Sequence, residues 1–118
     1  MSQASHKFRQ WRDSATGQEG LTYWCQGCDE AHGIRTKGPG SWGWNGDLEK
    51  PVFTPSVLTT WTQRSKGKPP IEHRCHTFVG CNGAQPGEVI FLSDCTHALA
   101  GTVQPFPDLP DFLKDNQP

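Results

Sequence analysis

Cysteine and histidine are the residues of this sequence whose types and spacing suit metal binding. Cys25 and Cys28 stand three positions apart in Tyr-Trp-Cys-Gln-Gly-Cys, and Gly27 between them lets the backbone turn so that both sulfurs face one point. A tetrahedral structural zinc needs two further ligands, commonly from another hairpin. The remaining candidates are Cys75, Cys95, His32, His76 and His97.

Strand geometry narrows the choice of ligands. If residues 71–79 are extended, Cys75 and His76 point to opposite faces and cannot easily serve one metal. We prefer a closed all-cysteine Zn²⁺ site over a mixed Cys/His set, because thiolates suit a closed structural site. Its ligands would be Cys25, Cys28, Cys75 and Cys95. The redox role of a C-x-x-C motif needs a βαβ setting, which the sequence lacks, and metal-free buried cysteines are the simpler alternative. Cys81 is expected to be a free surface thiol.

Ser56 is the strongest candidate nucleophile. It follows Pro55, whose ring fixes its own φ and pushes Thr54 out of the helical region. A serine hydroxyl is inert alone and needs a base within hydrogen-bond reach, oriented by a carboxylate. His76 and His97 stand beside the presumed zinc thiolates, with Asp94 nearby, so a metal would hold them rigidly. Yet most Pro-Ser pairs are turns, and a histidine in a zinc protein is more often a ligand than a base.

A tryptophan-rich loop, residues 41–47, is the candidate substrate contact. Trp42 and Trp44 would form a groove wall, with Asn45 and Asp47 offering polar contacts, or the two indoles would simply cover a small core.

Composition and charge exclude several classes of protein. Leu, Ile, Val and Phe make up only about 18% of the 118 residues, yet 11 basic against 12 acidic side chains leave a net charge of −1, which is not typical of disorder. The odd count of 5 Cys and the lack of a signal peptide disfavour a secreted disulfide scaffold and favour the reducing cytoplasm. No apolar run approaches a membrane span. The near-neutral charge disfavours nucleic acid, and Arg64, Lys66 and Lys68 are expected to form a solvated loop.

The elements that must position these residues are short strands. Strand-like composition occurs in residues 21–24, 53–61, 71–79 and 89–92, between turns rich in Gly, Pro and Lys. One helical turn is expected from Thr96 to Gly101. We expect a mostly β (small α+β) fold: one zinc-stapled antiparallel β domain with long loops and little helix, over residues 21–103. Residues 1–20 and 104–118 are expected to be tails.

Taken together, these segments resemble a family of small phage and bacterial proteins. The resemblance covers roughly residues 21–105 and rests on Trp24-Cys25-x-x-Cys28, His32, Trp42-x-Trp44-Asn45-Gly46-Asp47, Pro51-x-Phe53-x-Pro55-Ser56, Arg74-Cys75-His76 and Phe91-Leu92-x-Asp94-Cys95-x-His97-x-Leu99-Ala100-Gly101. Phage members are often labelled ammonia monooxygenases without good reason. Bacterial members sit in operons with ubiquitin-like proteins and their activating and conjugating enzymes, where they resemble metal-bound serine peptidases.

The resemblance implies roles for particular residues. The family's four cysteines fall on Cys25, Cys28, Cys75 and Cys95, its Pro-Ser element on Ser56, and the two histidines of its second half on His76 and His97. By chemistry, Ser56 would be the nucleophile, either histidine the base, and Asp94 or Asp47 its orienter. Oxyanion donors would come from the backbone of residues 98–101 or 44–46.

The leading hypothesis is therefore a zinc-stabilised serine peptidase that cleaves at the C-terminus of a ubiquitin-like protein. In a phage it would act in the host cytoplasm against an antiviral modification. The alternatives are a non-catalytic zinc-ribbon module that inhibits a host protein, and a zinc hydrolase whose open site uses histidines.

Overall fold

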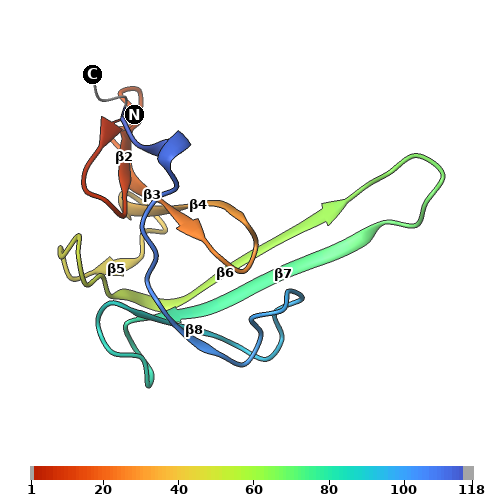
Figure 1. Cartoon of the computed structure of the whole chain (residues 1–118). Coiled ribbons are helices and arrows are strands. Elements are labelled where there is room, and N and C mark those ends of the chain that lie inside the picture. Colours follow the sequence, from red (N-terminus) through yellow and green to blue (C-terminus); the bar gives the residue numbers. More distant parts are fainter. Residues whose placement is uncertain (1, 116–118) are drawn as a thin grey trace.

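The fold is built from two antiparallel sheets. The structure is a computed structural model that describes residues 2–115 (Figure 1). The first sheet has the order β1-β2-β3-β4 and the second the order β5-β6-β7-β8-β9, with every neighbouring pair antiparallel. The expectation of a mostly β fold with antiparallel strands and little helix is confirmed.

The first sheet contains β1 (Ser2–Gln3), β2 (Arg9–Arg12), β3 (Glu19–Cys25) and β4 (Glu30–Lys37). The second contains β5 (Gly43–Trp44), β6 (Phe53–Gln63), β7 (Ile71–Val79), β8 (Glu88–Phe91) and β9 (Val103–Pro105). The one helical element among the described residues is a single 3₁₀ turn, η1 (Asp111–Leu113). The helical turn expected after Thr96 is instead a pair of hydrogen-bonded turns, in which Ala100 N–H bonds to His97 and Thr102 N–H to Leu99.

Alternation of buried and exposed residues along the strands places one face of each sheet against a shared core. In β7 the side chains of Cys75, Thr77 and Val79 are buried, whereas the residues between them are not. The expectation that Cys75 and His76 face opposite sides is thereby confirmed. In β3 the same alternation buries Leu21 and Tyr23.

The two segments expected to be tails differ from that expectation. Phe8 and Phe106 are 0% and 3% exposed, and the centroids of their rings lie 5.1 Å apart. Both rings pack against Tyr23, and Phe8 also packs against Phe53. Leu109 is also buried. The low aliphatic content explains this result, because the central strands do not supply enough apolar surface to complete a core, and the terminal segments supply the missing rings.

Hydrogen bonds also tie the terminal segments to each other. Arg9 Nη1 pairs with Asp115 Oδ1 at 2.8 Å, and Lys7 Nζ pairs with Asp108 Oδ1 at 2.8 Å. The folded unit therefore extends from β1 to at least Asp115, beyond the expected boundaries of 21 and 103.

The β6–β7 hairpin is the longest feature of the molecule. Figure 1 shows its far half projecting from the two sheets as an arm that ends in the loop of residues 64–70. That loop is exposed throughout, as expected for the Arg64, Lys66 and Lys68 cluster. Among the described residues, no helix is long and apolar enough to cross a membrane.

Candidate active site and metal centre

Ser56 lies on β6 at an irregularity of the strand. The pairing of β6 with β7 shifts register between Phe53 and Val57, and the Thr54–Pro55 peptide bond is cis. Ser56 is half-buried, and its carbonyl oxygen accepts a hydrogen bond from Trp42 Nε1 at 3.1 Å. The indole therefore holds the backbone of the serine from the side opposite β7.

His76 approaches Ser56 from the neighbouring strand. Its cross-strand partner is Leu58, two residues after the serine, so the two side chains share the face of the sheet that points away from the core. His76 Nε2 lies 2.9 Å from Ser56 Oγ, and the imidazole side chain is 26% exposed. This distance lies within the range for direct proton transfer.

Asp94 reaches the other nitrogen of the same ring. Its Oδ2 lies 3.2 Å from His76 Nδ1. The loop after β8 continues along β7, where Leu92 N–H bonds to the carbonyl of His76 at 2.9 Å and Thr96 N–H bonds to the carbonyl of Arg74 at 3.0 Å. The turn between these two anchors directs the Asp94 carboxylate back onto the ring. Arg74 Nη1 also lies 3.8 Å from Asp94 Oδ2.

These contacts form a continuous line from hydroxyl to imidazole to carboxylate. A neutral imidazole that donates Nδ1–H to Asp94 leaves Nε2 free to accept the proton of Ser56 Oγ–H. That arrangement can generate an alkoxide nucleophile and return the proton to a leaving group, which is the chemistry of a Ser-His-Asp triad.

The other candidate base and orienter lie elsewhere. The His97 ring packs edge-on against Phe91, with 5.0 Å between ring centroids, and its Nδ1 accepts a hydrogen bond from Leu99 N–H. Asp47 Oδ1 accepts the backbone N–H groups of Glu49 and Lys50, and the Lys50 N–H contributes most to the lowered pKa of this carboxyl. Asp47 thus stabilises its own loop.

Of the residues expected to contact substrate, only some lie near Ser56. Trp42 touches the serine backbone, as described, whereas Asn45 uses its side chain to bond Val52 N–H and the carbonyl of Lys50 within the loop. Trp44 lines a surface groove of about 660 Å³ together with Trp11 and Leu48. Neither Ser56 nor His76 lines that groove, so the groove is not part of the candidate catalytic site.

The backbone donors expected for an oxyanion hole mostly have other partners. In the turn of residues 98–101, Ala100 N–H bonds to His97 O, Gly101 N–H to Phe91 O, and Leu99 N–H to the ring of His97. At the other expected turn, Asn45 N–H bonds to Val52 O. These groups serve to fix their loops.

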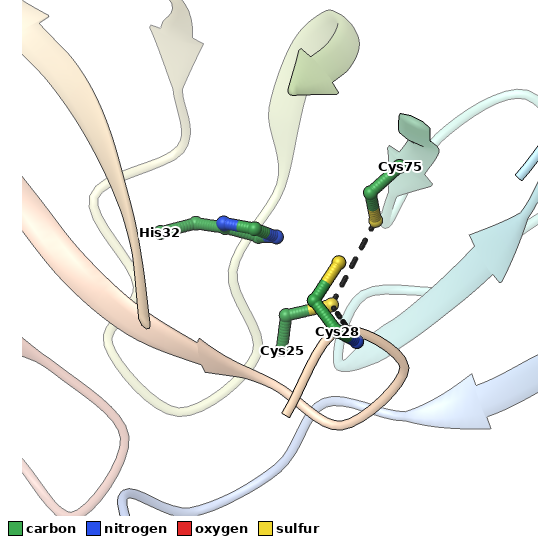
Figure 2. Close-up of side chains that lie close together, drawn as sticks. All are labelled: Cys25, Cys28, His32 and Cys75. Carbon is green, nitrogen blue, oxygen red and sulfur yellow. Dashed lines mark hydrogen bonds between the residues drawn. The ribbon is translucent and has the colours of Figure 1, made fainter. Parts of the chain in front are cut away.

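Three cysteines and one histidine converge on the core side of β7. Figure 2 shows Cys25 and Cys28, from the end of β3 and the turn after it, facing Cys75 of β7, with the His32 ring of β4 directed at the sulfurs. Their ligand atoms all lie within 4.8 Å of one another. The Sγ atoms of Cys25 and Cys75 are 3.7 Å apart, close to the roughly 3.8 Å edge of a zinc tetrahedron with Zn–S bonds of about 2.3 Å.

The donor set fits a bound cation. The thiols of Cys28 and Cys75 stabilise a thiolate on Cys25 by hydrogen bonding, which lowers the pKa of Cys25. Hydrogen bonding to the Cys25 thiolate favours the protonated forms of the other two thiols, which raises the pKa of Cys28 to about 12 and also raises the pKa of Cys75, and repulsion between adjacent thiolates acts in the same direction. A divalent cation removes that repulsion and allows all three sulfurs to ionise.

His32 supplies the fourth donor of this group. The residue is 6% exposed, and its Nε2 is buried with no hydrogen-bond partner among the described residues. A buried polar atom without a partner is costly, and coordination to a metal would satisfy it. The mixed Cys/His alternative to the all-cysteine set thus has a specific geometric basis.

Cys95 belongs to a second, adjoining group. Cys75, Cys95 and His97 also have ligand atoms within 4.8 Å of one another, so Cys75 is shared between the two groups. Cys95 Sγ lies 3.3 Å from both the N and the O atoms of His76 and so contacts the backbone of the histidine that faces Ser56. Both groups could hold a metal ion.

Gly27 is required for a reason that differs from the one expected from the sequence. The residue with a left-handed backbone in this turn is Asp29, at φ 55°, whereas a Cβ atom on Gly27 would collide with the His97 ring. The turn is closed by Cys28 N–H, which donates to Cys25 Sγ at 3.4 Å. Close approach of the His97 ring, rather than the turn conformation, therefore disfavours a side chain at Gly27, because the ring would have to move.

Cys81 is half-buried rather than fully on the surface. Its thiol donates to the carbonyl of Phe53 at 3.4 Å, and burial raises its pKa. It belongs to neither metal-binding group.

Comparison with known proteins identifies the family. The model of the bacterial ubiquitination-like system serine protease family (BubE) matches residues 3–86, which is more than half of the chain and includes Ser56, His76 and the three clustered cysteines. No curated protein and no solved structure matches the chain. The chain therefore belongs to the family of bacterial ubiquitination-like system serine proteases.

Proposed function

We propose that this protein is a serine peptidase that cleaves a peptide or isopeptide bond at the C-terminus of a ubiquitin-like protein, with Ser56 as nucleophile, His76 as general base and Asp94 as orienter. The observation that carries the proposal is the line of contacts at 2.9 Å and 3.2 Å through the two nitrogens of His76. Membership of a family of serine proteases supports the reaction class, and the family's ubiquitination-like system supports the class of substrate.

In the proposed reaction, Ser56 Oγ attacks the carbonyl carbon of the scissile bond while His76 Nε2 takes the hydroxyl proton. Asp94 stabilises the resulting imidazolium through Nδ1–H. His76 then gives the proton to the departing amine, the C–N bond breaks, and an ester between Ser56 and the substrate's acyl group remains. Water hydrolyses the ester with His76 again acting as base, which restores the serine and releases the carboxylate.

A structural zinc is part of the proposal. Cys25, Cys28 and Cys75 with His32 would hold it, and a zinc with four protein ligands supplies a cross-link and no reactive position. That cross-link would join the turn after β3 to β7 at Cys75, directly beside His76, whose side chain points to the opposite face. The chain's own residues would carry out the chemistry, and the thiolates suit a reducing cytoplasm.

The test is cleavage of a ubiquitin-like precursor that carries a C-terminal extension, followed by mass spectrometry of the products. Ser56→Ala is expected to lower kcat by at least about 1,000-fold. Ser65→Ala, in the exposed loop of the arm, is the matched control and should cleave like the parent. Cleavage by Ser56→Ala at the parent rate would contradict the serine mechanism. Stable binding of the ubiquitin-like protein without cleavage by the parent would instead support the binding-module alternative.

A further inference from the structure

One edge of β6 has no partner strand along the arm. On one side β6 pairs with β7 over its length, whereas on the other side β5 pairs only with Phe53 and Thr54. From Val57 to Gln63, no strand of the described chain covers this outer edge. Figure 1 shows the far half of this stretch projecting beside β7 with no other strand along its outer side.

Hydrogen bonds show which residues direct their backbone to that edge. The carbonyl of Val57 points toward β7, where it accepts a bond from Thr77 Oγ1, whereas the carbonyl of Ser56 points outward to the Trp42 indole. Backbone direction alternates along a strand in an antiparallel pair. Leu58, Thr60 and Thr62 therefore present their N–H and C=O groups to the open edge.

The side chains of these three residues lie on the same face of the sheet as Ser56 and His76. Leu58 pairs with His76, Thr60 with Arg74, and Thr62 Oγ1 donates to Glu72 across the hairpin. Leu58 is 52% exposed and stands next to the imidazole of His76 in the sheet. A chain bound at this edge would thus lead directly to Ser56.

The open edge also lacks the usual protection against pairing. Exposed edge strands normally carry lysine, proline or inward-pointing charges that prevent association. Residues 57–62 of β6 contain Val, Leu, Thr and Trp and no charged residue or proline. Such a segment favours pairing with another extended chain.

We propose that the extended C-terminal tail of the ubiquitin-like substrate binds as an added antiparallel strand on the outer edge of β6, at Leu58, Thr60 and Thr62. The inference rests on the proposed function and specifies how its substrate is held. Because β6 runs from Ser56 toward the tip of the arm, an antiparallel tail runs toward Ser56 and delivers its C-terminal end there. Trp42 and β5 occupy the edge beyond Ser56, so the added strand ends at the nucleophile.

The test measures binding in the Ser56→Ala background, where no chemistry interferes. A fluorescein-labelled synthetic peptide with the tail sequence of the system's ubiquitin-like protein is titrated with protein, and anisotropy gives Kd. Singly N-methylated versions of the peptide are then compared. Strand addition predicts that methylation weakens binding about ten-fold at every second residue and little at the residues between, because only alternate amides face β6.

A protein variant tests the same contact from the other side. Thr60→Pro removes an outward N–H without removing a bond to β7, whereas the control Thr60→Ala keeps that N–H. We expect Kd to rise about ten-fold for Thr60→Pro relative to Thr60→Ala. Equal Kd values for the two variants, or methylation effects without the two-residue period, would overturn the proposal, as would occupation of this edge by a second copy of the chain that excludes the peptide in sedimentation experiments.

The two proposals fail in different ways. If the parent cleaves through Ser56 but the methylation pattern is absent, strand addition is wrong and the peptidase assignment stands. If the parent cleaves nothing while the alternating pattern is present, the peptidase assignment is wrong and the edge remains a binding site.

Discussion

His76 Nε2 lies 2.9 Å from Ser56 Oγ, although the two residues stand 20 positions apart on different strands. Cross-strand pairing sets His76 opposite Leu58, and the register shift before Val57 allows Ser56, two residues away, to reach the same ring. Irregularities of this kind in a strand can redirect a side chain, and this one brings the Ser56 hydroxyl to the His76 imidazole.

Asp94→Asn is expected to remove most of the activity without unfolding the protein. An amide cannot stabilise the imidazolium and favours the wrong tautomer of His76, so kcat should fall by about 100- to 10,000-fold. The measurement is kcat on the ubiquitin-like precursor, with circular dichroism to verify the fold.

The matched variant for this experiment is Asp47→Asn, at the other carboxylate that the sequence offers as an orienter. Asp47 accepts two backbone N–H groups of its own loop, so this change should alter stability more than kcat. A larger loss of kcat for Asp47→Asn than for Asp94→Asn would contradict the assignment.

Metal analysis should distinguish the two groups of ligands that share Cys75. If zinc is held by Cys25, Cys28, Cys75 and His32, then Cys28→Ser and His32→Ala lose the metal, and Cys95→Ser retains it. Elemental analysis of the purified proteins gives the stoichiometry, expected to be about one zinc per chain. Cys81→Ser is the control, because Cys81 belongs to neither group.

Removal of the metal should also lower stability. A strong chelator is expected to reduce the Tm of the parent, since binding free energy at a structural zinc site contributes to folding.

One outcome of the metal analysis would contradict the mixed Cys/His set. Retention of zinc by His32→Ala together with its loss from Cys95→Ser would favour the all-cysteine set instead.

Gly27→Ala should destabilise the fold by about 1–3 kcal/mol, because the added Cβ collides with the His97 ring and forces it to move. Gly33→Ala on β4 is the matched control: its Cβ would meet no atom within 4 Å, and its effect should stay within about 0.5 kcal/mol. Urea denaturation of both variants measures the difference. Equal stability of the two would show that the His97 ring yields at little cost.

Acid should weaken the attachment of the C-terminal segment. The Lys7 ammonium donates to Asp108 and lowers the pKa of that carboxyl below its usual 3.8. A depressed folded-state pKa means that the contribution is present above the unfolded-state pKa and is lost as pH falls through the folded-state value. Since Asp108 is 61% exposed, the pair contributes only about 0.2–1 kcal/mol.

The corresponding variant is Asp108→Asn. It should be less stable than the parent by that amount at pH 7, and the difference should vanish at a pH below the folded-state pKa of Asp108, which itself lies below 3.8, because the parent carboxylate is then protonated as well. Thermal unfolding at the two pH values makes the comparison. A difference that persists in acid would assign the effect to packing rather than to charge.

The central strands could be predicted from the sequence because they depend on local patterns. Residues 21–24, 53–61, 71–79 and 89–92 correspond to β3, β6, β7 and β8, whose alternation and β-branched or aromatic content are visible without any fold. β4 was not predicted, since its run Glu-Ala-His-Gly-Ile-Arg-Thr-Lys has few apolar residues and a central glycine. Pairing with β3 stabilises it as a strand.

The candidate site, too, could be predicted only where it depends on local sequence patterns. The sequence by itself determined which residue types are present and, through the two-residue period of β7, that Cys75 and His76 serve opposite faces. It could not determine that His76 rather than His97 meets Ser56, or that His32 joins the clustered thiols. Those partners depend on a register shift in β6 and on the loop that returns along β7. The sequence also could not show that the terminal segments complete the core through Phe8 and Phe106. Periodicity fixes the face on which a side chain lies, whereas distances between strands are set by pairing and packing over the whole fold, and only the tertiary structure decides them.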